Sequence, residues 1–343
     1  MEKEELKVCV TGGSGYIAAS LIKKLLLQGY TVHATLRNLK DESKVGFLRR
    51  LPHAEARLVL FEADVYEPLA FQAPIHGCHF VFHVATAFQH HQPSQYKSLT
   101  EATVEAAKEI AKCCIKAKTV RRLIYTSSVL AASPLGDDGA TSLKDFKDES
   151  CWTPLHHLPN FPYINDYLKN YVESKTESER EILRYNERKE DGGLLEVVSL
   201  ACGLVGGDSV LNASVSGSAM VIISQLKDSE MEFHSMRFIE ELLGKIPIVH
   251  VQDVCDAHIF CLQKPSFTGR FLVASSYVSS ADIGNYYLQT YPELHVKHKY
   301  LEGPRRDIKW GSTKLTDEGF ACKYDTKAIL DDCVRCARRV GDL

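Results

Sequence analysis

A tyrosine and a lysine four positions apart are the first residues of this chain whose spacing suits chemistry. Tyr171 and Lys175 belong to a helical pattern over 163–187, and side chains at positions i and i+4 share one face of a helix. A phenol with a pKa near ~10 donates its proton slowly at neutral pH, and a neighbouring ammonium lowers that pKa. The same spacing at Tyr185 and Lys189 lies in a densely charged helix end, which indicates solvated surface. We therefore predict Tyr171 as the proton donor and Lys175 as its cationic partner.

A serine supplies the third candidate. Ser128 ends the segment Tyr125–Ser128, which continues an apolar strand pattern that begins at Arg122. Ligands of open α/β sheets bind outside the carboxyl ends of the parallel strands. A hydroxyl there is placed to hydrogen-bond a substrate carbonyl while Tyr171 gives the proton. Alone, each residue has a structural explanation, as a strand cap, a half-buried ring or a surface ammonium. The combination, downstream of a nucleotide-binding turn, favours catalysis.

That turn lies at the start of the chain. The apolar run 7–10 leads into Gly12, Gly13 and Gly15, and apolar residues at helical spacing follow. A buried strand, a tight turn and a helix N-terminus in this order bring backbone N–H groups close to a pyrophosphate, whose charge the helix dipole favours. The pattern predicts dinucleotide binding, with contacts from Gly12, Gly15, Tyr16 and Ile17.

The residue at the end of the second predicted strand decides between NAD and NADP. A carboxylate there bonds the ribose 2′-hydroxyl, whereas arginine accommodates a 2′-phosphate. Arg37 stands at this position, and no acid follows before Asp41. A guanidinium grips phosphate through two hydrogen bonds, and Lys44 is a second cation, so we predict NADPH. Asp64, with Val65 beside it, is placed to bond the adenine amino group, although a turn or helix cap is its structural alternative.

Short apolar segments alternate with helical ones through the first two-thirds of the chain. The helical patterns include 99–118 and 163–187. The predicted strands are Lys7–Val10, Thr31–Leu36, Leu58–Phe61, Phe80–Val84, Arg122–Thr126 and Leu195–Leu200. This alternation is typical of an α/β fold with a Rossmann-type, doubly wound parallel sheet. We predict an NADP-binding domain over 1–200, to which 246–275 returns, and a smaller substrate-binding lobe from 201–245 and 276–343.

The composition argues against several other classes of protein. The 343 residues carry 41 basic and 44 acidic side chains, so neither a nucleic-acid surface nor an anionic-membrane surface is expected. We find no signal peptide and no bilayer-length apolar run, and we expect a cytoplasmic, monomeric protein. The 11 cysteines are scattered and include one lone C-x-x-C, at Cys333 and Cys336, so we expect ordinary thiols and no metal.

With the three catalytic candidates joined to the glycine turn, the chain resembles the extended short-chain dehydrogenase/reductases. Within them it resembles the plant dihydroflavonol reductase and anthocyanidin reductase group. The similarity spans nearly the whole chain. It is carried by Val10–Tyr16, Ala34–Arg37, Gly77–Cys78, Val81–Thr86, Lys118–Ser128, Asp148–Ser150, Val249–His258 and Gly319–Tyr324.

The resemblance implies NADPH dependence, the Ser/Tyr/Lys roles given above, and a flavonoid or related phenolic carbonyl as substrate. It implies that Val84, Ala85 and Thr86 line the nicotinamide side and that the segment with Ala201, Gly203 and Leu204 flanks the nicotinamide amide. We also predict Ser127 as a cofactor contact. The residues we take as substrate contacts are Phe88, His90 and Ser133, the last standing where dihydroflavonol reductases carry an asparagine. Ala18 and the segment Phe71–Ile75 are similar to anthocyanidin reductases, and Ala201-Cys202 replaces the Pro-Thr turn of dihydroflavonol reductases.

Other functions remain open at this point. Dihydroflavonol 4-reductase and cinnamoyl-CoA or other carbonyl reductase are alternatives within the group. A nucleotide-sugar epimerase or dehydratase of the same superfamily would normally show an acid near position 37. A non-catalytic NADP-binding regulatory protein would be expected to lack Tyr171 or Lys175, and both are present.

Overall fold

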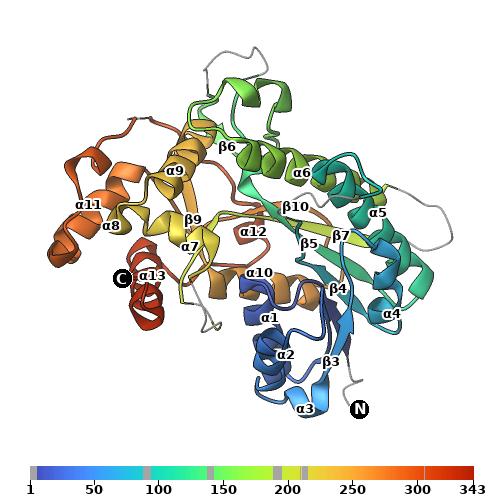
Figure 1. The fold of residues 1–343 in the computed structure, drawn as a ribbon. Coiled ribbons are helices and arrows are strands. Elements are labelled where there is room, and N and C mark those ends of the chain that lie inside the picture. Colours follow the sequence, from blue (N-terminus) through green and yellow to red (C-terminus); the bar gives the residue numbers. More distant parts are fainter. Residues whose placement is uncertain are drawn as a thin grey trace. The chain divides into compact units, whose positions relative to one another are not determined.

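A seven-stranded sheet forms the centre of the fold, with the strand order β10-β7-β5-β4-β1-β2-β3 (Figure 1). The computed structural model describes residues 6–87, 94–136, 143–187, 195–208, 210, 215–304 and 306–343. The strands are β1 (Lys7–Val10), β2 (Thr31–Leu36), β3 (Leu58–Glu62), β4 (Phe80–His83), β5 (Arg122–Ser128), β7 (Glu196–Cys202) and β10 (Gly269–Val273). β1 pairs in parallel with both β2 and β4, so the strand order reverses between β1 and β4. Sheets of this kind bind ligands at that reversal.

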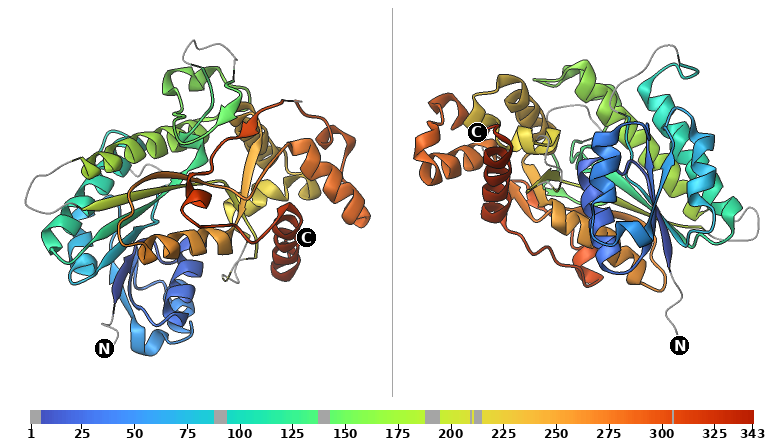
Figure 2. Two further views of the ribbon diagram at one scale, coloured as in Figure 1. Left: turned by 180° about the vertical axis from the view of Figure 1, so that it is seen from behind. Right: turned by 60° about the horizontal axis from the view of Figure 1, so that its bottom comes forward.

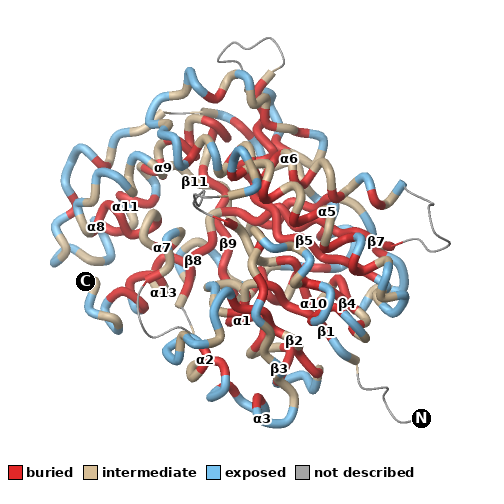
Figure 3. Tube along the Cα trace, turned by 45° about the vertical axis from the view of Figure 1, so that its right-hand side comes forward, coloured by how far each residue is buried: buried red, intermediate tan, exposed pale blue. Residues whose placement is uncertain are grey.

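Helices cover both faces of this sheet (Figure 2). On one face are α1 (Tyr16–Leu27) and α10 (Val251–Gln263), which Lys24 and Asp256 join by an ion pair. On the other are α4 (Gln72–Ile75), α5 (Leu99–Ala117) and α6 (Asp166–Leu183). Apolar side chains of α5 and α6 pack there against Cys9, Val81, Leu123 and Val197. The central strands β4 and β5 are buried along their whole length, as Figure 3 shows.

Two smaller sheets and the remaining helices complete the fold. Two helices, α2 (Glu42–Arg49) and α3 (Ala54–Arg57), lie between β2 and β3. A three-stranded sheet has the order β11-β9-β8, and a two-stranded one pairs β12 with β6. Their strands are β6 (Phe146–Lys147), β8 (Leu204–Gly206), β9 (Ile246–His250), β11 (Ser276–Val278) and β12 (Lys309–Trp310). The other helices are α7 (Gly217–Ile222), α8 (Ser224–Lys227), α9 (Glu230–Leu243), α11 (Ser280–Thr290), α12 (Lys314–Asp317) and α13 (Thr326–Val340).

The backbone contacts divide the chain into two compact units. The first comprises 1–127, 173–200 and 255–270, and the second comprises 128–172, 201–254 and 271–343. The predicted domains put 128–172 with the nucleotide-binding part. Here that segment groups with the second unit, because Leu130, Leu158 and Val172 belong to the hydrophobic core of that unit.

Most predicted elements form within one to three residues of the expected bounds. β5 is longer than expected and includes Ser127 and Ser128. The helix predicted over 163–187 begins instead at Asp166, because the Asn165 side chain accepts a hydrogen bond from the Leu168 N–H at 2.8 Å and caps it. In the part of the chain that the structure describes, no helix is both long and apolar enough to cross a membrane.

Candidate active site

The turn after β1 brings the backbone close to the end of β4. Gly12 has φ of 70°, and a Cβ placed on it would lie 3.0 Å from the Ala85 Cα. Both the left-handed backbone and the close approach therefore require glycine here. Gly15 is the N-cap of α1, where no side chain caps the helix and no acidic residue lies in the first turn. This end of α1 suits the negative charge of a pyrophosphate.

A threonine hydroxyl clamps the turn to the segment after β4. Thr11 Oγ1 accepts hydrogen bonds from the backbone N–H groups of Val84 and Ala85, each at 3.0 Å. It also lies 3.0 Å from His83 Nδ1. A hydroxyl has two lone pairs and one proton, so Thr11 donates its proton to His83 Nδ1, and the ring proton of His83 is on Nε2. Sequence reasoning missed this role of Thr11 and His83; the signal was two polar residues at the ends of otherwise apolar strands.

Burial keeps the His83 ring neutral. Burial, with a smaller contribution from the charge of Lys175, lowers the pKa of His83 to about 3. In the unfolded chain a histidine has a pKa of ~6.5 and takes up a proton that it does not bind in the folded state. The contribution of His83 to the free energy of unfolding is therefore fully present above pH ~6.5 and is lost as the pH falls.

We therefore expect a pH-dependent loss of stability that His83 causes. Between pH 7.5 and pH 5, His83 is expected to remove about 2 kcal/mol from the free energy of unfolding. Urea unfolding at the two pH values measures the loss in the unmodified chain and in His83→Asn, whose amide oxygen still accepts from Thr11. The variant should lose about 2 kcal/mol less on acidification. Equal losses in the two proteins would show that His83 is not held neutral.

Arg37 is exposed to solvent, whereas Lys44, the second predicted cation, forms an ion pair with Asp41. Arg37 follows β2, and among the described residues no side chain or backbone group pairs with its guanidinium. Lys44 Nζ instead lies 2.8 Å from a carboxylate oxygen of Asp41, the N-cap of α2. Asp64 accepts a hydrogen bond from the Tyr66 N–H at 3.0 Å, so one of its oxygens stabilises a turn. Arg37 is thus available to a phosphate, whereas Lys44 already has a carboxylate.

Ser128 and Tyr171 come together as predicted. A hydrogen bond joins the two side chains. Ser128 is the last residue of β5, and its Oγ also accepts from the Leu130 N–H at 3.2 Å. Burial raises the pKa of Tyr171 to about 12, and the hydrogen bond with Ser128 opposes the rise. This direction is opposite to the lowering that we expected from Lys175, because burial outweighs the effects that lower the pKa, and the Tyr171 oxygen keeps its proton at neutral pH.

Lys175 lies one helical turn beyond Tyr171 on α6. Its side chain is buried, and its Nζ donates to the Thr126 carbonyl at 2.8 Å and lies 5.1 Å from the centre of the Tyr125 ring. The Ser127 hydroxyl is also buried and has no hydrogen-bond partner in the described part of the chain. This orphaned hydroxyl belongs to the residue that follows Thr126, whose carbonyl Lys175 binds, and it fits a polar ligand group such as a ribose hydroxyl.

Other predicted residues take different places. Ser133 is fully buried, and its hydroxyl donates to the Leu242 carbonyl at 2.6 Å, which gives it a packing role. Phe88 and His90 lie outside the described residues. Gly203 donates its N–H to the Val273 carbonyl at 2.8 Å. The other predicted contacts lie in the first turn of α1, after β3, after β4, and on β7 and β8; they are Tyr16, Ile17, Val65, Val84, Thr86, Ala201 and Leu204.

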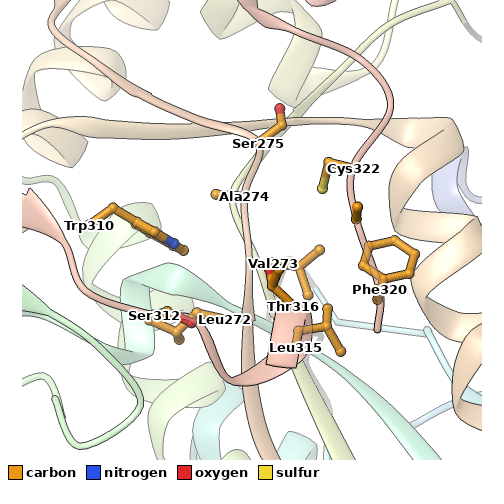
Figure 4. A pocket seen from close by; sticks show the side chains of 11 residues that line it. Leu272, Val273, Ala274, Ser275, Trp310, Ser312, Leu315, Thr316, Phe320 and Cys322 are labelled. Carbon is orange, nitrogen blue, oxygen red and sulfur yellow. The ribbon is translucent and has the colours of Figure 1, made fainter. Parts of the chain in front are cut away.

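A cavity of about 240 Å³ lies elsewhere, between the end of β10 and the segment around α12. The rings of Trp310 and Phe320 lie on opposite sides of it, and the Cys322 side chain faces it (Figure 4). None of the residues that line this cavity is a predicted site residue.

Comparisons with known proteins agree with this arrangement. Residues 8–274 match the model of the "NAD dependent epimerase/dehydratase family". Anthocyanidin reductase of Vitis vinifera is 31% identical over 334 residues, which cover 97% of this chain and 95% of that protein. Vestitone reductase of Medicago sativa is 32% identical and covers 98% of both chains. Its crystal structure superposes with a TM-score of 0.77 over 98% of this chain and 99% of that one.

These findings confirm the predicted resemblance and the predicted α/β fold class. They agree with the predicted oxidoreductase class, since the relatives named here are reductases, and with a nicotinamide cofactor. The family match covers well over half of the chain, from β1 to the residue after β10. The chain belongs to the NAD dependent epimerase/dehydratase family.

Proposed function

We propose that this chain is an NADPH-dependent reductase of a flavonoid-type or related phenolic carbonyl compound, most similar in action to anthocyanidin reductase. The observation that carries the proposal is the hydrogen bond between Ser128 and Tyr171 at the carboxyl end of β5. The relatives support the substrate class, because anthocyanidin reductase, vestitone reductase and dihydroflavonol 4-reductase all match over nearly the whole chain.

Each catalytic side chain has a separate task. A bound nicotinamide would supply the hydride for the carbonyl carbon. Ser128 holds the carbonyl oxygen by a hydrogen bond, and Tyr171 gives that oxygen a proton as it gains negative charge. Lys175 contributes a positive charge from the same helix, which stabilises the phenolate that remains on Tyr171. The orphaned Ser127 hydroxyl and the Lys175 ammonium are our candidates for holding the nicotinamide ribose.

The phosphate-binding residues favour NADPH over NADH. Gly12 and the uncapped start of α1 fit a pyrophosphate, which both cofactors have. Only Arg37, exposed and unpaired within the described chain, distinguishes them, because a guanidinium suits a 2′-phosphate. The cytoplasmic location and the monomeric state also remain part of this proposal.

Replacing Arg37 should separate the two cofactors. Arg37→Ala is expected to weaken NADPH binding by about 10–100-fold, because a hydrogen bond to a charged group contributes about 1.5–3 kcal/mol. NADH binding should change little, and Lys44→Ala should cost much less, since Asp41 already pairs with that ammonium. Fluorescence titration of the reduced cofactors measures both affinities. An equal loss for NADPH and NADH would contradict the assignment of Arg37.

A substrate panel tests the function as a whole. Oxidation of NADPH is followed with anthocyanidins, dihydroflavonols, isoflavanones and hydroxycinnamoyl thioesters, and with a nucleotide sugar as the alternative substrate class. We expect turnover with at least one phenolic compound and none with the nucleotide sugar. Turnover of the nucleotide sugar alone, or of no phenolic compound, would overturn the proposal.

A further inference from the structure

Two side chains hold the backbone that follows Ser128. The segment Val129–Ala132 is a 3₁₀ turn and its C-cap, with Ser128 as the N-cap. Lys147 Nζ donates to the carbonyls of Val129, at 3.2 Å, and of Ala132. Thr153 donates from its hydroxyl to the Leu130 carbonyl and from its backbone N–H to the Ala131 carbonyl, at 3.0 Å. Four successive carbonyls after Ser128 are thus bonded by Lys147 and Thr153.

Burying the Lys147 ammonium costs free energy that packing alone does not explain. Its side chain is fully buried, and removing an ammonium from water carries a large penalty unless hydrogen bonds replace the hydration. β6 places it, since Lys147 lies in register with Trp310 of β12. An apolar side chain would fill the same volume without that penalty. What the ammonium adds is a fixed position for the carbonyls that it binds.

That position bears directly on Ser128. The Ser128 Oγ accepts from the Leu130 N–H at 3.2 Å, so the orientation of the hydroxyl depends on where the turn lies. Leu130 is the residue whose carbonyl Thr153 holds. The Thr153 hydroxyl in turn accepts the Ser133 N–H at 3.0 Å, which fixes the end of the same segment.

We propose that Lys147 and Thr153 are positioning residues for Ser128, acting through the carbonyls of the turn that Ser128 caps. The inference rests on the proposed reductase function. Neither residue needs to touch the substrate. Both set the direction of the hydroxyl that meets the substrate carbonyl and hydrogen-bonds Tyr171.

Kinetics of paired variants test the inference. Lys147→Met keeps an unbranched side chain, one atom shorter, and removes its donors. It is expected to lower kcat about 10–100-fold, because a misplacement of about 1 Å at a reacting group has an effect of this size. NADPH affinity should change less than about threefold, since the residues assigned to the dinucleotide lie on other segments. Lys144→Met, an exposed lysine three residues earlier, is the matched control and should keep full kcat.

A double-mutant cycle separates positioning from general damage. In a Ser128→Ala background, Lys147→Met should lower kcat no further, because its effect passes through Ser128. Thr153→Val should also lower kcat, by a smaller factor, and should lower it no further in the Ser128→Ala background. Thr153→Ser, which keeps the hydroxyl, should have the kcat of the unmodified chain. If Lys147→Met does not fold, the threonine pair decides the question. Losses that multiply in the double variant would overturn the inference.

A second readout does not depend on turnover. In protein labelled at the tyrosine Cζ carbon, the Tyr171 resonance is assigned by its loss in Tyr171→Phe. Lys147→Met or Thr153→Val should shift this resonance as the Ser128 hydrogen bond changes, and Lys144→Met should not. An unmodified chain without activity on the panel would defeat the proposed function alone. An unmoved resonance in the folded variants would defeat this inference alone.

Discussion

Replacing Tyr171 by phenylalanine is expected to lower kcat by about 10²–10⁴-fold, the usual contribution of a positioned general acid. The variant loses only the hydroxyl, which hydrogen-bonds Ser128 and, in the proposed mechanism, carries the proton for the substrate oxygen. The ring stays, so the fold and the NADPH affinity should be preserved. Steady-state kinetics with the best substrate of the panel, together with cofactor titration, measure the two effects.

The chain supplies its own control for this experiment. Tyr185 begins the second Tyr-x-x-x-Lys spacing, but its side chain is buried and its hydroxyl lies 3.3 Å from the Lys108 carbonyl. Tyr185→Phe should therefore keep kcat within about twofold, since the ring belongs to the hydrophobic core beside α5. An unchanged kcat in Tyr171→Phe would contradict the assignment of Tyr171 as the proton donor. A loss of kcat in Tyr185→Phe alone would indicate Tyr185 as the proton donor instead.

Among the substitutions proposed for this chain, removing the carboxylate of Glu179 is expected to lower the free energy of unfolding most. Glu179 lies one helical turn beyond Lys175 and is fully buried on α6. Its oxygens accept from the Ser199 hydroxyl at 2.5 Å and from Arg270 Nη2 at 2.9 Å. Glu179→Ala leaves a buried guanidinium without its carboxylate, so we expect a loss of about 3–5 kcal/mol in the free energy of unfolding.

Two further variants calibrate that number. Glu177→Ala breaks an exposed pair with Arg180, 3.0 Å long, and should cost about 0–1 kcal/mol. Ser199→Ala removes one hydrogen bond to Glu179 and should cost about 1 kcal/mol. Urea unfolding of the three variants gives the comparison. If Glu179→Ala costs no more than Glu177→Ala, the buried pair does not anchor this part of α6.

The sequence by itself determined the elements and the catalytic residue types. Apolar runs too short for helices marked the buried strands, and spacing within one helix or one strand end placed Tyr171, Lys175 and Ser128. The glycine turn was equally local, because the φ of 70° at Gly12 and the start of α1 need only neighbouring residues. Arg37 was recognisable because it directly follows a strand.

The tertiary structure alone decided which polar groups remain available. Lys44 is paired with Asp41, and the Ser133 hydroxyl is bonded to Leu242, so each already has a partner within the chain that its residue type did not indicate. The clamp of Thr11 on His83 and the contacts of Lys147 join residues 72 and 15 or more positions apart. Burial and hydrogen-bond partners depend on which segments meet in space. Residue types and their spacing along the chain do not show which distant segments come into contact.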